Sequence, residues 1–311
     1  MANPNDQSNG SQIKRLSLSD AGNNGPRVKM VSQSRMAWEQ FRRHRVAIVA
    51  ITVFTIMMVM CFLAPVIAPF EFDQIDLKNR KSPPTEKHWL GTDNLGRDLY
   101  TRILYGGRIS ITIGIFSAVV GTAIGVVVGA LAGFYGGRLD NALMRFTDVA
   151  YSVPTLPLLI VLSSYTRSAA PSMVLIIGFL SWMSTARVVR ASVLSVKKKE
   201  FVEAAFSIGS NDFRLVAKHI LPNIAGPIIV GTTLSVGGAI ITESSLSFLG
   251  LGVQPPTPTW GNMLQESQST IASEPWLTIF PGMAILVIVL CVNFIGDGLH
   301  DALDPTLRRY D

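Results

Sequence analysis

The sequence has little charge, few cysteines and few histidines. Asp, Glu, Lys and Arg make up only 15% of its 311 residues, whereas a soluble domain carries about 25%. The two cysteines, Cys61 and Cys291, both lie in apolar runs, so they offer neither a disulfide framework nor a paired-cysteine metal site. The 4 histidines lie in separate connecting segments, without an HExxH pair. These shortages argue against a soluble protein and against zinc or redox chemistry.

Motifs for catalysis and for nucleotide binding are missing as well. No G-x-S-x-G nucleophile elbow occurs, no pair of catalytic carboxylates stands out, and the dipeptide Gly-Lys is absent, which excludes a G-x-x-x-x-G-K-[ST] phosphate loop. The 27 Lys and Arg residues lie between apolar runs, instead of gathering on one basic face as in a nucleic-acid binder. We therefore expect a chain that is not an enzyme, binds no metal or cofactor and has no nucleic-acid partner.

Long uncharged runs are what the sequence has in abundance. A helix of about 20 apolar residues crosses the roughly 30 Å hydrocarbon core of a membrane. Six candidate spans are found, at residues 46–68, 109–134, 146–165, 172–189, 224–248 and 276–295. Pro154 and Pro157 interrupt the third, which we expect to be kinked and to face protein or a cavity. The sequence thus predicts an all-α membrane protein with six transmembrane helices.

The second span carries a small residue at every fourth position. The repeat consists of Ser117, Gly121, Gly125, Gly129 and Gly133. Because lipid gives helices no hydrophobic reason to associate, close backbone approach along small residues is a common basis for their packing. We expect this ridge to lie against another helix.

The distribution of Lys and Arg predicts the orientation. With the N-terminus inside, the cytoplasmic segments hold 19 of these residues and the outer segments 8, and cytoplasmic loops carry the excess of Lys and Arg. The segment 69–108 holds seven of the outer cations together with six acids. The N- and C-termini and the loop 187–219 are therefore predicted to be cytoplasmic. Residues 1–35 are polar, without an apolar run or a cleavable signal, and are predicted to form a disordered cytoplasmic tail.

The loop 199–222 has the most informative local pattern. It contains, in order, Glu203, Ala204, Ala205, Gly209, Leu221 and Pro222. We expect a short helix, a turn at Gly209, a second helix capped by Asn211 or Asp212, and a break at Pro222 before the next span. Such a projection suits insertion into a groove on a partner protein, although a simple amphipathic surface loop would have the same spacing.

These six residues resemble the EAA loop of ABC importer permeases, the segment that docks on the ATP-binding subunit. Three further stretches, 90–98, 245–261 and 296–305, occur in the order found in one subfamily. From about Trp38 to its end the chain resembles the C-type permease subunit of dipeptide and oligopeptide importers. The resemblance implies a type I ABC importer permease fold with a cytoplasmic coupling helix. It divides the chain into the tail 1–35, a segment 36–108 with the first span and an outer loop, and a permease core 109–311.

The resemblance also implies the partners and the setting. These are a second permease subunit, two ATP-binding subunits that use ATP and Mg²⁺, an extracytoplasmic solute-binding protein and a peptide substrate, assembled in the lipid of a bacterial inner membrane. Similar permeases of this family serve nickel or glutathione. A secondary transporter coupled to ions and a membrane scaffold are the rival classes.

A polar cluster near the outer end of the fifth span is the candidate part of the translocation pathway. It consists of Thr242, Glu243, Ser244 and Ser245. An ionisable residue inside a span is a functional candidate, but helix packing or a gate would explain Glu243 as well as contact with substrate does.

Three motifs carry structural expectations. The stretch 91–98 is expected to form a turn that starts a short helix before the second span. The loop 254–261 is expected to be extended, with Trp260 at the membrane interface. Asp297, Asp301 and Asp304 share one helical face by their spacing, as a solvated helix end or as an interface with the ATPase.

Overall fold

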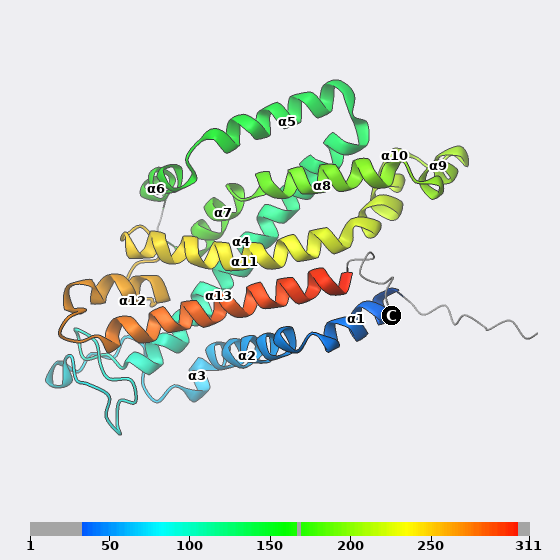
Figure 1. Ribbon diagram of the computed structural model, residues 1–311. Helices are drawn as coiled ribbons and strands as arrows, with labels where there is room; N and C mark the ends of the chain where they lie inside the picture. Colours follow the sequence, from blue (N-terminus) through cyan, green and yellow to red (C-terminus); the bar gives the residue numbers. More distant parts are fainter. Residues whose placement is uncertain (1–32, 167–168, 304–311) are drawn as a thin grey trace, which may run out of the picture.

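The computed structural model describes residues 33–166 and 169–303, and within these ranges every regular element is helical. Most of the predicted tail 1–35, and Asp304, lie outside the described residues. Along the chain the helices are α1 (Gln33–Arg43), α2 (Arg45–Phe62), α3 (Ala64–Ile67), α4 (Leu99–Tyr135), α5 (Gly137–Ser152), α6 (Thr155–Tyr165), α7 (Ala170–Phe179), α8 (Trp182–Lys197), α9 (Glu200–Ser207), α10 (Asp212–Arg214), α11 (Ala225–Phe248), α12 (Trp260–Ser267) and α13 (Trp276–Leu303). The long helices lie roughly side by side, with α9 at one end of the molecule and α12 at the other (Figure 1).

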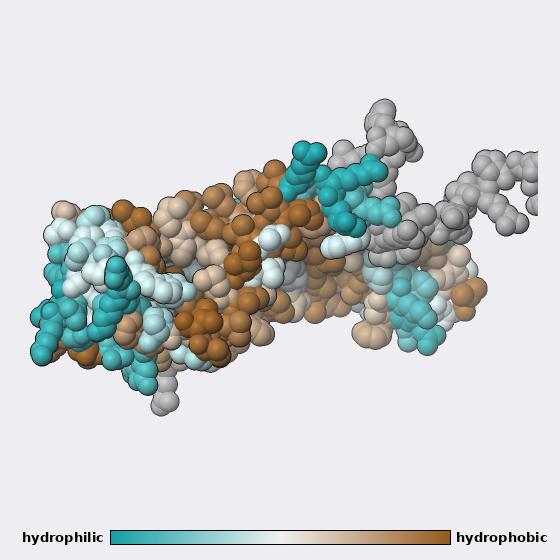
Figure 2. All heavy atoms as spheres, turned by 90° about the horizontal axis from the view of Figure 1, so that it is seen from below, coloured by the Kyte–Doolittle hydropathy of each residue, from teal (hydrophilic) through white to brown (hydrophobic). Residues whose placement is uncertain are grey.

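The apolar helices account for the predicted spans. Among the described residues four helical stretches are long and apolar enough to cross a membrane: Arg45–Phe62, Leu99–Tyr135, Asp212–Phe248 and Trp276–Leu303. Two bent pairs, α5 with α6 (82°) and α7 with α8 (45°), complete six spans when each pair counts as one. Hydrophobic side chains form a broad band between two hydrophilic ends in the view of Figure 2. The all-α class is confirmed, and so is the expected bend near Pro154.

Helix α4 is the centre of the packing, in contact with α2, α7, α8 and α11. The glycines of its ridge are buried against α7 and α8. A Cβ atom on Gly125 would lie 2.7 Å from the Cβ of Thr185 and 2.8 Å from the carbonyl oxygen of Trp182. The prediction that this ridge packs against another helix is confirmed, because no larger side chain fits at this separation.

The predicted short helix before the second span is wrong. The Asp98 carboxylate accepts a hydrogen bond from the Thr101 amide (2.9 Å) and caps α4 directly, so the helix runs unbroken from Leu99 for 37 residues. Gly106 and Gly107 lie within this helix. They leave the space in which the backbone of residues 259–260 and the Trp260 ring pack. The domain boundary expected at residue 108 falls inside this helix.

Buried ion pairs hold the loop before α4 onto α12. Arg97 contacts Asp93 (2.6 Å) and Glu266 (2.8 Å), and Arg102, which is 1% exposed, reaches Glu266 (3.1 Å). These ion pairs fasten the folded loop before α4 to α12.

At the surface of the same loop, a hydrogen bond from the side-chain amide of Asn79 lowers the pKa of the Asp76 carboxyl below its ordinary value.

Trp260 does not lie at a membrane interface, and that prediction is wrong. The residue is fully buried, and its indole nitrogen donates to the carbonyl of Ile103 (3.0 Å). Its ring fits against Gly107 of α4, where a Cβ atom would lie 2.6 Å from the ring. Trp260 thus fastens the start of α12 to α4.

The acidic face near the end of α13 is only partly described. Asp297 is exposed, and Asp301 lies 3.7 Å from the imidazole of His44 at the junction of α1 and α2. The end of α13 therefore packs beside the start of the first span.

Candidate functional site

Helix α9 projects from the end of the bundle, and its two faces differ. Val202 and Ala205 are buried against Val193 of α8 and against Leu215 and Ile220 beyond the turn. Glu203 and Ala204 lie on the exposed face. The side chain of Ala205 therefore packs within this chain.

The turn after α9 has the predicted geometry. Gly209 has a φ of +84°, a conformation that favours glycine. The Asn211 side chain then accepts from the Arg214 amide (2.9 Å) and caps α10. The predicted succession of helix, glycine turn and capped helix is confirmed.

The predicted break at Pro222 is wrong. A π-helical turn (Leu215–Ile220) and a 3-10 turn (Leu221–Ile224) join α10 to α11, and the stretch from Asp212 to Phe248 is continuously helical. Pro222 lies in the first turn of the 3-10 segment, where a missing N–H group is tolerated. Leu221 and Pro222 thus lie inside the continuous helical stretch that connects α9 and its turn to the bundle.

Three large apolar side chains at the tip of the projection were missed from the sequence. Phe206 is 65% exposed, Ile208 84% and Phe213 81%. The signal was available, since large apolar residues in a charged connecting loop are unusual unless a partner covers them. They form an apolar tip on either side of Gly209.

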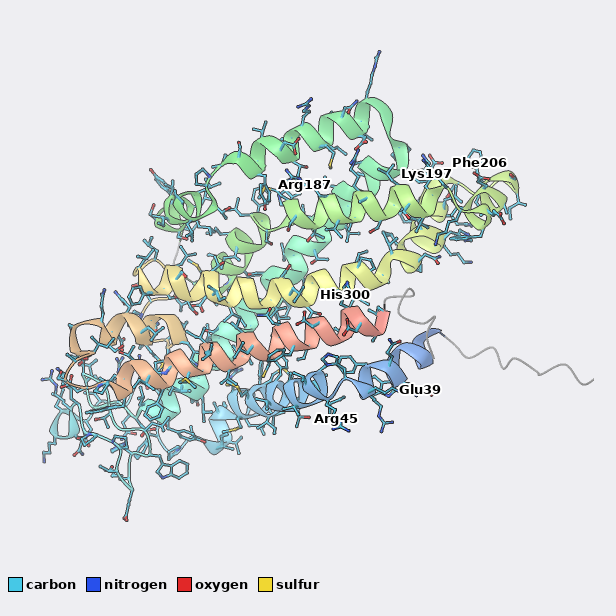
Figure 3. The ribbon with its side chains drawn as sticks, viewed as in Figure 1. Glu39, Arg45, Arg187, Lys197, Phe206 and His300 are labelled. Atoms are coloured by element: carbon cyan, nitrogen blue, oxygen red, sulfur yellow. The ribbon has the colours of Figure 1, made fainter. Side chains whose placement is uncertain are left out.

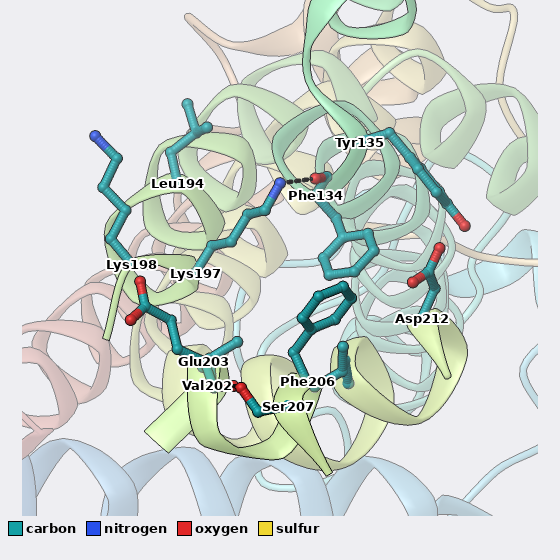
Figure 4. A pocket seen from close by; sticks show the side chains of 11 residues that line it. Phe134, Tyr135, Leu194, Lys197, Lys198, Val202, Glu203, Phe206, Ser207 and Asp212 are labelled. Atoms are coloured by element: carbon teal, nitrogen blue, oxygen red, sulfur yellow. Dashed lines mark hydrogen bonds between the residues drawn. The ribbon is translucent and has the colours of Figure 1, made fainter. Parts of the chain in front are cut away.

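A groove of about 610 Å³ separates α9 from the ends of α4 and α8. Lys197 donates to the carbonyl of Phe134, and its ammonium group stands 5.1 Å from the centre of that ring. Phe206 points from α9 toward Phe134 across the groove (Figure 4). The labelled Lys197 and Phe206 lie together at the α9 end of the molecule (Figure 3).

A second cavity, of about 370 Å³, lies where the two bent pairs break. The lining comes from α5 and α6, from α7 and α8, and from one face of α11: Tyr151, Thr155, Leu159, Ile177, Leu180, Ser181, Met183, Ser184, Ser235, Gly238, Ala239 and Thr242. Non-helical backbone at membrane depth is tolerated only where protein or a water-filled cavity covers it. The breaks at Val153–Pro154 and Leu180–Ser181 both border this cavity, whose polar lining groups are hydroxyls.

The predicted polar cluster on α11 is divided around the helix. Thr242 lines the cavity, whereas Glu243 is completely buried on the side of α4 and accepts from the hydroxyls of Ser110 (2.9 Å) and Ser247 (2.6 Å). Ser244 is also buried, and Ser245 is half-buried with its hydroxyl bonded to its own helix.

The position of Glu243 is fixed through Ser110. The Ser110 hydroxyl that donates to Glu243 also accepts from the Trp260 amide (3.3 Å). The carboxylate thus lies where α4, α11 and the start of α12 meet, a grouping that the sequence did not predict.

Family models match most of the chain. Residues 125–309 match the binding-protein-dependent transport system inner membrane component, and residues 32–84 match the N-terminal transmembrane domain of oligopeptide transport permease C. The chain belongs to this family of inner membrane transport components. The resemblance to C-type permease subunits is confirmed, and this permease is a subunit of an ABC importer.

Curated relatives cover nearly the whole permease. The oligopeptide transport system permease protein OppC of Bacillus subtilis is 38% identical over 93% of this chain and 96% of its own length. The dipeptide transport system permease protein DppC of the same organism is 39% identical over 90% and 88%. The glutathione transport system permease protein GsiD of Pectobacterium atrosepticum is 41% identical over 88% and 91%.

A solved structure shares the fold. A chain of the inward-facing MetNI methionine ABC transporter matches with a TM-score of 0.54 and 18% identity, over 66% of this permease and 98% of that chain. At that identity the match bears on the fold alone, and it confirms a type I ABC importer permease fold.

Proposed function

We propose that this permease imports peptides, with the cavity between α5/α6, α7/α8 and α11 as its half of the translocation pathway. The observation that carries the proposal is the meeting of both helix breaks at one cavity lined by hydroxyl groups. Broken helices and small polar side chains at membrane depth are typical of a passage for a polar solute. A second permease subunit supplies the other half.

The chemistry of the cavity suits a peptide. Among the described lining residues, the polar groups are the hydroxyls of Ser, Thr and Tyr, which can donate to or accept from a peptide backbone. Nickel suits imidazole ligands, and the described lining contains no histidine, so we favour peptides as the substrate. Glutathione is itself a tripeptide, and the relative named for its transport keeps it within this substrate class.

The apolar tip and the groove beside it are the proposed docking surface for an ATP-binding subunit. Phe206, Ile208 and Phe213 are the side chains that a partner would cover. Glu203 and Ala204 contribute the exposed face of α9, Gly209 sets the direction of the turn, and Ala205 anchors the projection from inside.

Movement at the tip reaches the cavity through a continuous helix. Leu221 and Pro222 lie in the helical stretch that runs from Asp212 to the cavity face of α11. ATP binding and hydrolysis in the partner subunits, with Mg²⁺, supply the movement. This chain binds no nucleotide in the proposal.

Within the polar cluster on α11 we assign substrate contact to Thr242 and a packing role to Glu243. Thr242 lines the cavity, whereas the Glu243 carboxylate, about 100° further around the helix, accepts from the Ser110 and Ser247 hydroxyls. Ser244 and Ser245, which follow them in the sequence, are assigned no separate role.

The permease is proposed to lie in a bacterial inner membrane with both termini and the α9 end in the cytoplasm. The Lys and Arg distribution supports this orientation. The α12 end then meets the solute-binding protein, which delivers the peptide.

The test is ATP-dependent peptide uptake by the complete importer in vesicles whose ion gradients have been collapsed. Phe213→Asp should abolish co-purification of the ATP-binding subunits and uptake together, because it places a charge on the apolar tip. Leu77→Asp is the matched control for co-purification, since Leu77 is 63% exposed in the loop at the α12 end, away from the apolar tip. Uptake that needs an ion gradient instead of ATP would refute the function, and a Phe213→Asp complex that keeps its ATP-binding subunits would refute the docking surface.

A further inference from the structure

One exposed ion pair lies beside the cavity that is proposed as the translocation pathway. Arg187 of α8 donates from Nη2 to Oδ1 of Asp148 on α5 (2.8 Å), and the side chains are 44% and 54% exposed. The guanidinium carbon of Arg187 stands 4.7 Å from the centre of the Tyr151 ring. Figure 3 shows Arg187 between α5 and α8.

The pair lies between the cavity and the α9 end of the bundle. The residues that flank Arg187 in α8 pack on the glycine ridge: Thr185 faces Gly125, and Ala186 and Val189 face Gly129. These contacts place Arg187 well inside the end of α4 at Tyr135. Its contact with the Tyr151 ring places Arg187 on the side of the bundle that carries the cavity.

The pair is continuous with the cavity. Tyr151, whose ring contacts the guanidinium group, is one of the lining residues, and so is Ser184, one helical turn before Arg187. The described lining is otherwise apolar or carries hydroxyl groups. Arg187 and Asp148 thus lie next to the lining residues on the α9 side of the cavity.

A neighbouring ion pair shows what a purely structural one looks like in this fold. Arg190 binds both carboxylate oxygens of Asp140 (2.5 and 2.6 Å), and the Asp140 side chain is only 13% exposed. The Arg187–Asp148 pair has one such bond and is much more exposed. Exposed pairs contribute little stability, so this pair can exchange its partner at small cost.

We propose that Arg187 and Asp148 form a transient site for the charged ends of a passing peptide. A guanidinium group binds a carboxylate with two parallel hydrogen bonds, which matches the C-terminus of a peptide. Asp148 then accepts from the N-terminal ammonium group. The site rests on the proposed function, since it requires a peptide as the substrate.

The test compares a peptide that has a free C-terminus with the same peptide amidated. The complete importer, with its solute-binding protein, is reconstituted in vesicles, and the peptide pair is chosen so that both forms stimulate ATP hydrolysis by the wild type. Because the binding protein is unchanged in every variant, its own selectivity cancels when each uptake ratio is divided by the wild-type ratio.

Arg187→Gln should lower the kcat/KM for uptake of the free-carboxylate peptide about tenfold and leave the amidated peptide unchanged. Arg187→Lys should keep part of the preference for the free-carboxylate peptide over the amidated one, since lysine retains the charge without the paired donors of arginine. Asp148→Asn should reduce discrimination between free and acetylated N-termini in the same way. Arg145→Gln is the control, because it removes an exposed cation from α5 one turn before Asp148.

The outcomes separate the site from the function. Equal loss for both peptides in Arg187→Gln, or an equal effect of Arg145→Gln, would overturn the site and leave peptide import intact. The double variant Arg187→Gln/Asp148→Asn, which leaves no unpaired charge, should assemble normally and still lose the preference for free termini. Retention of that preference by the double variant would also overturn the site. Absence of ATP-dependent uptake by the wild-type importer would instead refute the proposed function.

Discussion

Gly125 of α4 lies directly against α8, and Gly125→Ala tests whether that approach holds the bundle together. The added methyl carbon would lie 2.7 Å from the Cβ of Thr185, 2.8 Å from the Trp182 carbonyl oxygen and 2.9 Å from the Thr185 Cγ2. Ordinary contact between carbon atoms begins at roughly 3.5 Å. The Trp182 carbonyl belongs to the helix backbone, so a rotamer change cannot relieve it. Helix α8 must therefore move away from α4 by about 1 Å.

The free-energy cost of this movement decides whether Gly125→Ala stabilises or destabilises the folded protein. Overpacking a tight interface costs about 1–3 kcal/mol, whereas replacing glycine by alanine within a helix returns at most about 1 kcal/mol. The expected net destabilisation is about 1–2 kcal/mol, a factor of about 5–30 in the ratio of folded to unfolded molecules. Val127→Leu is the control, because Val127 is on the same helix and 58% exposed.

The chain's own thiols provide the assay. Cys61 and Cys291 are its only cysteines, and they are 3% and 6% exposed. A thiol-reactive dye, read on this chain's own gel band while the detergent-solubilised complex is heated, should label Gly125→Ala at a lower temperature than the wild type. Val127→Leu should follow the wild type. Coincident labelling curves for the two variants would refute the close-packing argument.

Three further predictions concern the carboxylate on α11, the turn and the orientation. Glu243→Ala should lower the temperature of cysteine labelling, since it leaves buried hydroxyls without their acceptor at about 1–3 kcal/mol; an unchanged temperature would contradict the packing role. Gly209→Ala should weaken binding of the ATP-binding subunits because of backbone strain of about 1–2 kcal/mol at positive φ, and Gly209→Asn should do so less; equal binding by all three proteins would contradict the turn geometry. Single cysteines at Ser210 and Thr257 should label from opposite sides of the membrane, and labelling from one side would contradict the six-span orientation.

The sequence predicted well those features that depend on local chemistry. The ridge of every fourth small residue, the bend near Pro154 and the turn at Gly209 follow from side-chain size and backbone restriction, which act over one or two helical turns. The structure has each of them where it was expected.

Features that depend on contacts between distant segments were less predictable. Trp260 has the amphipathic ring of a membrane-interface residue, but Gly107, far away in sequence, provides a buried place for it. Glu243 and Thr242 are adjacent in the polar pattern, yet Thr242 lines the cavity and Glu243 is buried against α4. Pro222 suggested a break because proline stops an α-helix, and a single sequence does not indicate that π and 3-10 turns would continue it.

The π-helical turn at Leu215–Ile220 sets the rotation of the apolar tip, about the helix axis, relative to the cavity face of α11. Relative to an α-helix, a π turn accommodates an additional residue, and each residue of an α-helix corresponds to about 100° of rotation. The angle between the apolar tip beyond this turn and the cavity face of α11 is therefore determined by how many residues the turn contains. Deleting one of them would keep the side chains of the apolar tip and of the cavity, while turning the tip by about a quarter of a revolution relative to the cavity. The apolar tip and the cavity do not touch, yet the length of this six-residue segment fixes their orientation relative to each other.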